Sequence, residues 1–312
     1  MDNFYLALNT VLPFLIYIFF GYGVRCSRLV DEAFMNKLNK MIFRAFFPVM
    51  MFSNVYHIED GLSPDPRFVC IALGSILLLL LFLLLLVPRI VPGNPQRGVI
   101  IQAVYRSNFV LFAIPLTAHL FGDEGAAFAT MLIAFVIPTY NVTAVIVLEL
   151  FHERSIHPLR LIKNVLSNPM ILGVLTGLLF RVLGIHIPAV VDETVVQFAD
   201  LTTPLALFVL GGTLHFSSVR GNLRYLAPAL FTKLCILPGI ALFAALLLGL
   251  PSMERFILFE LFATPVATAS YAMAQNMGGD GELAGQFVVF STTASVVTLF
   301  FWIFFMRSAG LL

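Results

Sequence analysis

The chain has 312 residues, of which 60% are apolar and only 11% charged, with a mean hydropathy of +0.96. This composition lies far outside that of soluble globular domains and indicates a polytopic membrane protein. The net charge of +1 gives no indication of a nucleic-acid partner, and three cysteines without paired spacing indicate neither a disulfide framework nor a thiolate metal site.

Ten apolar segments are each long enough to cross the hydrocarbon core of a bilayer, which needs about 20 residues. We therefore expect an all-α membrane fold. We expect the first segment to stay attached and not to be a cleaved signal, because no basic residues precede it and Arg25 and Arg28 follow it directly. The predicted spans are residues 5–24, 34–55, 68–90, 99–121, 125–150, 164–184, 194–216, 223–250, 254–277 and 283–307.

Basic residues are unevenly divided between the two sides of the predicted bundle. Nine lie in loops on the side opposite the amino terminus and four on the amino-terminal side. Because positively charged loops stay in the cytoplasm, we expect both termini to face outward from a plasma (inner) membrane. The longest connections are about a dozen residues, too short to fold as a separate domain.

The two halves of the chain repeat a proline pattern. Three prolines of the first half have a partner 156 residues later, where chance predicts about 0.46 such pairs. Five spans in each half mean that the second half enters the membrane from the opposite side, so we expect two inverted repeats, residues 1–156 and 157–312. The pairs are Pro13 with Pro169, Pro48 with Pro204, and Pro95 with Pro251.

Proline interrupts the fourth and ninth segments, at Pro115 and Pro265. A proline inside a helix removes a backbone hydrogen bond, and in lipid the freed groups need another partner. When two such breaks meet at mid-membrane, the half-helix N-termini present partially positive amides to an anionic ligand. A simple kink in each helix is the alternative, and the matching positions favour the ligand site.

Charged side chains within apolar segments are costly unless they are paired or hydrated. The deepest are Arg106, Lys233 and Glu260. A basic residue in each half favours an anionic substrate over a cation, with a structural ion pair of Lys233 and Glu260 as the alternative. Neutral hydrogen-bonding groups near the two breaks are Asn108, Tyr140, Asn141, Thr264, Thr268, Ser270 and Asn276.

Sequence motifs for catalysis are missing. No Gly-Lys dipeptide is present to form the phosphate-binding loop of ATP-driven pumps. The helical zinc motif requires a second histidine four residues after His152, where the chain has Ile156, and His157 comes one residue too late. We expect no enzymatic activity, no metal site and no cofactor.

Several stretches resemble the auxin efflux carrier family, which includes plant auxin-efflux proteins and many bacterial permeases for malonate or related dicarboxylates. These stretches are residues 108–116, 168–173, 204–214 and 290–295. The similarity spans essentially the whole chain. The chain lacks the long cytoplasmic loop of many plant members and is similar to the compact, bacterial-type members.

The resemblance implies crossing broken helices at segments four and nine, as in bile-acid transporters and sodium/proton antiporters. It implies a scaffold of segments one, two, six and seven, a mobile transport domain of the others, and often a homodimer through the scaffold. It places the substrate carboxylate at Asn108, Tyr140 and Asn141. The acidic residue of plant members on segment three has no counterpart, so neither proton nor sodium coupling is indicated.

We therefore expect a secondary active or facilitative transporter of a small organic anion that works by alternating access in a lipid bilayer. Two alternatives stay open: a cation/proton antiporter of the same architecture, and a membrane receptor that binds an organic acid without transporting it. The candidate substrate-binding residues are Arg106, Asn108, Pro115, Tyr140, Asn141, Lys233, Thr264, Pro265 and Thr268.

Overall fold

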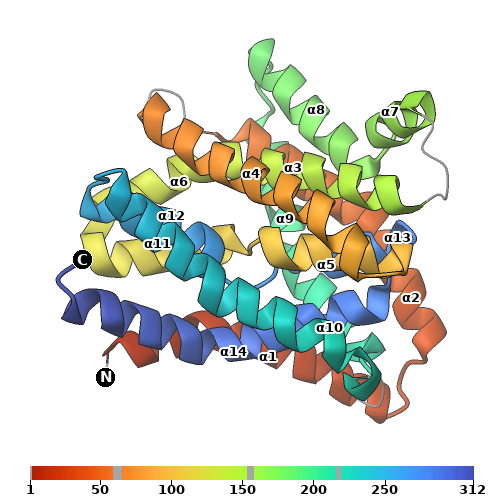
Figure 1. Cartoon of the computed structure of the whole chain (residues 1–312). Helices are drawn as coiled ribbons and strands as arrows, with labels where there is room; N and C mark the ends of the chain where they lie inside the picture. Colours follow the sequence, from red (N-terminus) through yellow and green to blue (C-terminus); the bar gives the residue numbers. More distant parts are fainter. Residues whose placement is uncertain (1, 59–64, 153–157, 216–218) are drawn as a thin grey trace.

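The computed structural model describes residues 2–58, 65–152, 158–215 and 219–312, and their secondary structure is helical (Figure 1). The elements are α1 (Asp2–Cys26), α2 (Glu32–Met41), the π-helix η1 (Ile42–Phe46), α3 (Phe47–Tyr56), α4 (Pro66–Ile90), α5 (Asn94–Tyr105), α6 (Phe109–His152), α7 (Pro158–Leu166), α8 (Pro169–Val182), α9 (Ala189–Thr213), α10 (Val219–Phe231), the π-helix η3 (Thr232–Ile236), α11 (Leu237–Leu247), α12 (Ser252–Ala263), α13 (Ala269–Asn276) and α14 (Gly281–Ser308).

Within the described residues, five helical stretches are long and apolar enough to cross a membrane by themselves. Each of the ten predicted segments falls on one of the helices or on consecutive ones, but some are short or divided by breaks. The membrane-type helical fold is confirmed, and the ten-span arrangement stays a prediction. The five stretches are Pro66–Ile90, Phe109–His152, Ala189–Thr213, Val219–Leu247 and Gly281–Ser308.

Several helices begin at a polar cap that the sequence supplies. The side chain of Asp31 accepts a hydrogen bond from the Phe34 amide at 2.7 Å, and Asp280 accepts one from Leu283 at 3.0 Å. An N-cap oxygen satisfies one of the amides that the first turn of a helix leaves without a partner. These caps fix where the apolar helices start.

Helix α1 packs against α9 at backbone contact. A Cβ atom added to Gly211 would lie 1.9 Å from the Ile18 carbonyl oxygen, and one added to Gly21 would lie 1.9 Å from that of Phe208. Only glycine permits such an approach, and small residues are the usual means of close helix packing in membranes. The two glycines therefore join α1 and α9 into one unit.

A second glycine seam joins α3 and α8. A Cβ atom on Gly173 would lie 2.3 Å from the Pro48 carbonyl oxygen, and Gly177 faces the backbone of Phe52. The Gly173–Gly177 spacing thus serves packing within the chain. Helices α1, α3, α8 and α9 correspond to the predicted scaffold segments.

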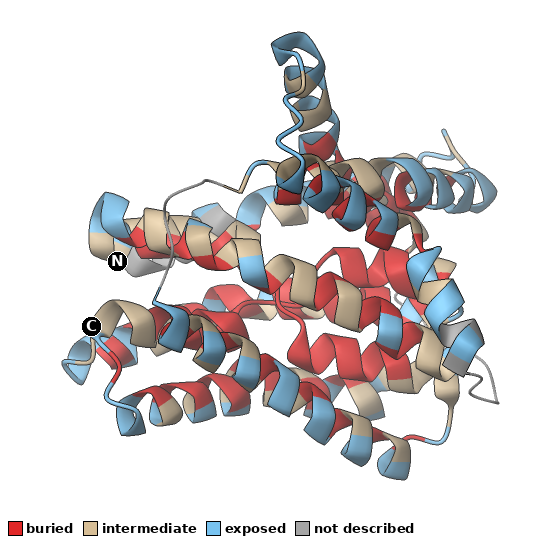
Figure 2. Ribbon diagram, turned by 90° about the horizontal axis from the view of Figure 1, so that it is seen from above, coloured by how far each residue is buried: buried red, intermediate tan, exposed pale blue. Residues whose placement is uncertain are grey.

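Apolar side chains cover the outer faces of the bundle. Leu78 is 69% exposed, Phe20 64% and Phe301 61%. Figure 2 shows the buried residues concentrated in the middle of the bundle and the exposed ones on its outer faces. Such a surface suits a hydrocarbon solvent, and both chain termini lie at the same end of the bundle (Figure 1).

Two helix breaks meet inside the bundle. The chain is non-helical at residues 106–108, between α5 and α6, and at residues 264–268, between α12 and α13. An isolated antiparallel bridge pairs Ser107 with Val266, and the Asn108 amide donates to the Pro265 carbonyl at 2.7 Å. The second break therefore supplies a hydrogen-bond acceptor to the first, as buried backbone requires in lipid.

The prediction that Pro115 marks the break in the fourth segment is wrong. Pro115 lies inside α6, and the break precedes it, where Arg106 has an extended backbone with φ −88° and ψ 128°. The bridge to the other break holds that conformation, so no proline is needed there. Pro265 does lie in its break, and Thr264 before it is extended (φ −74°, ψ 153°), as a following proline favours.

Gly122 joins two helical parts of α6 without a loop. Its φ of 68° and ψ of −156° are accessible almost only to glycine. The half-helix that follows the first break therefore runs directly into the long second part of α6. The position of the break is fixed relative to Tyr140 and Asn141 on that second part.

Candidate functional site

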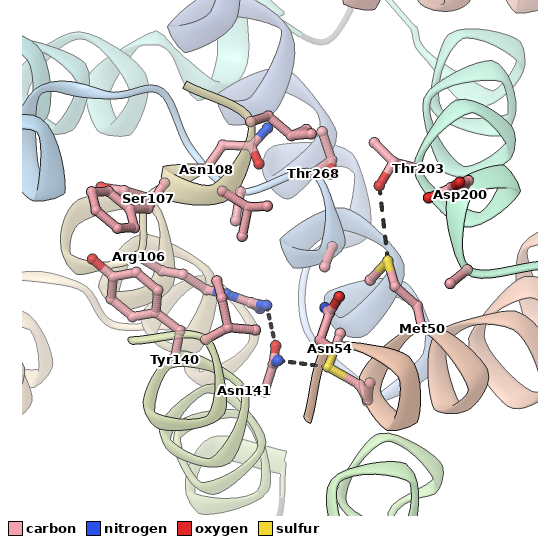
Figure 3. Close-up of a pocket in the computed structure, with 18 of the residues that line it drawn as sticks. Met50, Asn54, Arg106, Ser107, Asn108, Tyr140, Asn141, Asp200, Thr203 and Thr268 are labelled. Atoms are coloured by element: carbon pink, nitrogen blue, oxygen red, sulfur yellow. Dashed lines mark hydrogen bonds between the residues drawn. The ribbon is translucent and has the colours of Figure 1, made fainter. Parts of the chain in front are cut away.

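A cavity of about 340 Å³ lies beside the two breaks (Figure 3). Its wall is formed by α1, α3, α6, α9 and the residues of both breaks. Helices α1, α3 and α9 belong to the predicted scaffold, whereas α6 and the breaks belong to the predicted transport domain. The cavity thus lies at the boundary between these two groups of helices.

Arg106, in the first break, is a buried cation on the cavity wall and is only 4% exposed. Its guanidinium donates to the side-chain oxygen of Asn141 at 2.6 Å and contacts the Met273 sulfur at 2.9 Å. No carboxylate of the described residues lies within 4.0 Å of it. The guanidinium charge is therefore not neutralised by an ion pair within this part of the chain.

Asn141 connects the cation to the scaffold side. Its side-chain nitrogen contacts the Met51 sulfur on α3 at 2.6 Å, while its oxygen accepts from Arg106. Figure 3 shows this chain of contacts along one side of the cavity. Beside it, the Tyr140 hydroxyl donates to the Leu261 carbonyl at 3.3 Å, which ties α6 to α12 just before the second break.

Lys233 lies behind the cavity wall. It is fully buried on η3, does not line the cavity, and donates a hydrogen bond to the Ser107 hydroxyl. Ser107 in turn donates to the Leu261 carbonyl at 2.5 Å. The ammonium group therefore supports the first break from inside the protein and does not contact the cavity contents.

The ion pair of Lys233 with Glu260 is absent. Glu260 is fully buried, and neither of its carboxyl oxygens has a hydrogen-bond partner among the residues that the structure describes. Thr264, one helical turn later, is also fully buried, and its hydroxyl likewise has no partner there. Neither side chain lines the cavity.

Two helix N-termini open on the cavity. Phe109 and Leu111 in the first turn of α6 line it, as do Thr268 and Ala269 at the start of α13. The first amides of a helix have no intrahelical partner and carry partial positive charge. Both helices therefore direct the positive end of their dipole toward the same space.

Asn108 and Thr268 add neutral donors beside these N-termini. They are 9% and 8% exposed, both line the cavity, and Thr268 makes no side-chain capping bond. Their polar groups are available to a ligand because no bond of either side chain is found within the described ranges. Figure 3 shows both residues at the edge of the cavity.

The structure brings five of the nine predicted site residues to the cavity and leaves four away from it. Thr264 and Pro265 lie in the second break but do not line the cavity. Lys233 lies behind the first break, and Pro115 lies further along α6. The five on the wall are Arg106, Asn108, Tyr140, Asn141 and Thr268.

Sequence reasoning missed most of the scaffold side of the wall. Asn54 on α3 and Asp200 and Thr203 on α9 line the cavity. Each of the three is a polar residue in an apolar segment, and this feature of the sequence could have indicated their place on the cavity wall. Met50 and Met51 carry no such signal, because methionine in a membrane helix is ordinary packing material.

Comparison with known proteins places the chain among membrane proteins that move solutes. A family model described as membrane transport protein matches residues 6–158 and 152–303. A protein of Methanothermobacter thermautotrophicus, named as an uncharacterized transporter, is 22% identical over 300 residues, which cover 95% of this chain and 97% of the relative.

Proposed function

Because this chain belongs to the membrane transport protein family, that of the auxin efflux carriers, we propose that it carries a small organic anion across the membrane by alternating access. The carrier is secondary active or facilitative, and its cargo binds in the cavity beside the two breaks.

The observation that carries this proposal is that Arg106 is buried and has no ion-pair partner among the described residues. A buried charge is expensive unless it is paired, and no described carboxylate pairs with this guanidinium, which faces the cavity. A ligand that brings its own carboxylate supplies the missing counter-charge. Arginine is well suited to this role because its planar fork matches the geometry of a carboxylate.

The surrounding groups suit the same ligand. The N-termini of α6 and α13 add two partial positive charges to the cavity. Asn108 and Thr268 offer donors to the carboxylate oxygens, and Asn141 holds the guanidinium in place. Around Arg106 a cation would meet mostly donors, which disfavours the antiporter alternative.

The position of the cavity supports alternating access. Its walls come from the two groups of helices that the inverted-repeat model assigns to a scaffold and a transport domain, so a movement of one group against the other would open it to either side. Hydrogen bonds link α13 to the scaffold: Tyr271 with Thr213 at 2.5 Å, and Gln275 with Asn36 at 3.5 Å. In this proposal they close the path toward the cytoplasm.

The two contacting breaks support the inverted repeats, residues 1–156 and 157–312, because each repeat contributes one interrupted helix of the same form. The proposal retains a plasma-membrane location with both termini outside, and a homodimer through the scaffold. Labelling of the termini in intact cells tests the orientation, and cross-linking in membranes tests the dimer.

Flux into proteoliposomes tests the function directly. We expect the purified protein to take up at least one carboxylate from a panel of monocarboxylates, dicarboxylates and indole acids, and Arg106→Gln to abolish that uptake. Arg89→Gln, at an exposed arginine away from the cavity, is the matched control and should leave uptake unchanged. A carboxylate that raises the melting temperature of the protein without any flux would favour the receptor alternative.

A further inference from the structure

The cavity has a second charged residue opposite the first. Among the described residues that line it, Arg106 is the one arginine or lysine and Asp200 is the one aspartate or glutamate. Arg106 comes from the first break and Asp200 from α9, and Figure 3 draws them on opposite sides of the space. The cavity therefore has a positive wall and a negative wall.

Asp200 has no partner on its own wall. No hydrogen bond or ion pair of its carboxylate is found within the described parts of the chain, although its side chain is exposed to the cavity. Its neighbour Thr203 directs its hydroxyl to the Met50 sulfur at 4.0 Å. The carboxylate is therefore free to interact with whatever occupies the far end of the cavity.

A bound anion experiences both walls. Its carboxylate is attracted by Arg106 and by the N-termini of α6 and α13. A second carboxylate at its far end would face Asp200, and like charges repel. An N–H or ammonium group at the same end would instead form a charge-assisted hydrogen bond.

We propose that Asp200 selects among carboxylate substrates by the charge at their far end, favouring an ammonium group over a second carboxylate. This inference rests on the proposed function, because it takes for granted that a carboxylate binds at Arg106. It disfavours a dicarboxylate relative to an amino acid with the same number of carbons.

Three four-carbon acids test the selectivity because they share a carboxylate and differ at the other end. They are 4-aminobutyrate, butyrate and succinate, which carry an ammonium, a methyl group and a second carboxylate. We expect 4-aminobutyrate to bind more tightly than butyrate, and succinate to bind about tenfold or more weakly than 4-aminobutyrate. Binding is measured as the ligand-induced rise in melting temperature and as competition for uptake in proteoliposomes.

Asp200→Asn removes the charge and keeps the size of the side chain. We expect it to improve succinate binding at least about tenfold relative to 4-aminobutyrate, a change of about 1.4 kcal/mol, and to leave butyrate unchanged. Asp200→Glu keeps the charge and should keep the wild-type order. Glu193→Gln is the matched control, because Glu193 is exposed on the same helix but does not line the cavity.

If Asp200→Asn leaves the ratio of the succinate and 4-aminobutyrate affinities unchanged, the role of Asp200 is overturned. The proposed function still stands in that case, provided that Arg106→Gln abolishes carboxylate binding. Succinate preferred by the wild-type protein would also overturn the role of Asp200. If no carboxylate of the full panel protects the wild-type protein, the proposed function fails, and the role of Asp200 fails with it.

Discussion

Arg106 and Asn141 are joined by a hydrogen bond of 2.6 Å from the guanidinium to the side-chain oxygen of the amide. The amide fixes the orientation of the cation without neutralising it, since a neutral acceptor leaves the positive charge available to a ligand. An aspartate at the same place would satisfy the same geometry and cancel the charge. This difference makes position 141 a direct test of the anion site.

Asn141→Asp is expected to weaken carboxylate binding more than tenfold, because an internal ion pair would compete with the ligand for Arg106. The melting temperature without ligand should not fall, since the new pair is well placed. Binding is measured by thermal shift against ligand concentration. Asn94→Asp, at an amide whose oxygen accepts from Arg97 away from the cavity, is the control. Equal affinity in Asn141→Asp and wild type would contradict the assigned role.

The serine of the first break is expected to be coupled energetically to Lys233. Ser107→Ala removes the one hydroxyl that accepts from the buried ammonium in the described structure, and should destabilise the protein by about 1–3 kcal/mol. Lys233→Met in the same background should recover part of that loss, because no buried charge is then left without a partner. The double-mutant cycle is followed by thermal unfolding in detergent, and strict additivity of the two changes would argue against the coupling.

The glycine contact of α1 with α9 is expected to be sensitive to a single methyl group. Gly211→Ala places a Cβ atom against the Ile18 carbonyl and should cost about 1–3 kcal/mol, as overpacking does in well-packed interiors. Gly23→Ala, on α1 with no atom within 4 Å of the added Cβ, should leave the unfolding temperature within error of wild type. Similar losses in both variants would show that the close contact is not the cause.

Glu260 is expected to tolerate replacement by its amide. Its two carboxyl oxygens are buried without partners, and an unpartnered buried charge is too costly to retain, so we expect this group to be neutral. Glu260→Gln should therefore keep both the melting temperature and the carboxylate flux of the wild type. A loss of flux with unchanged folding would instead support coupling to a cation and favour the antiporter alternative.

The sequence was sufficient for the helices and for one of the two breaks. Apolar runs of about 20 residues have one stable solution in lipid, which is why the predicted segments fall on helices. The break at Pro265 follows from local chemistry, since proline acts on the residue before it. The cavity beside the breaks is lined by five residues that the sequence marks as polar groups in apolar segments, and their role in binding stays a prediction: Arg106, Asn108, Tyr140, Asn141 and Thr268.

The first break and the scaffold wall depend on contacts between distant parts of the chain. The extended backbone at residues 106–108 is held by Val266 and Pro265, more than 150 residues away in the sequence, and no local signal marks it. Pro115 was the stronger local signal and gave the wrong position. The role of Lys233 behind the wall likewise depends on which side of η3 faces Ser107, which periodicity alone does not determine.

The hydrogen bond from the Asn108 amide to the Pro265 carbonyl has a consequence for how such a carrier changes its cargo. The backbone of the two breaks forms hydrogen bonds within the protein, so its conformation does not depend on which molecule is carried. In the proposed function, recognition then depends on a few side chains such as Arg106, Asn108 and Asp200. A lineage with this framework needs only a handful of point replacements, and no remodelling of its helices, to acquire a new nutrient or signal molecule.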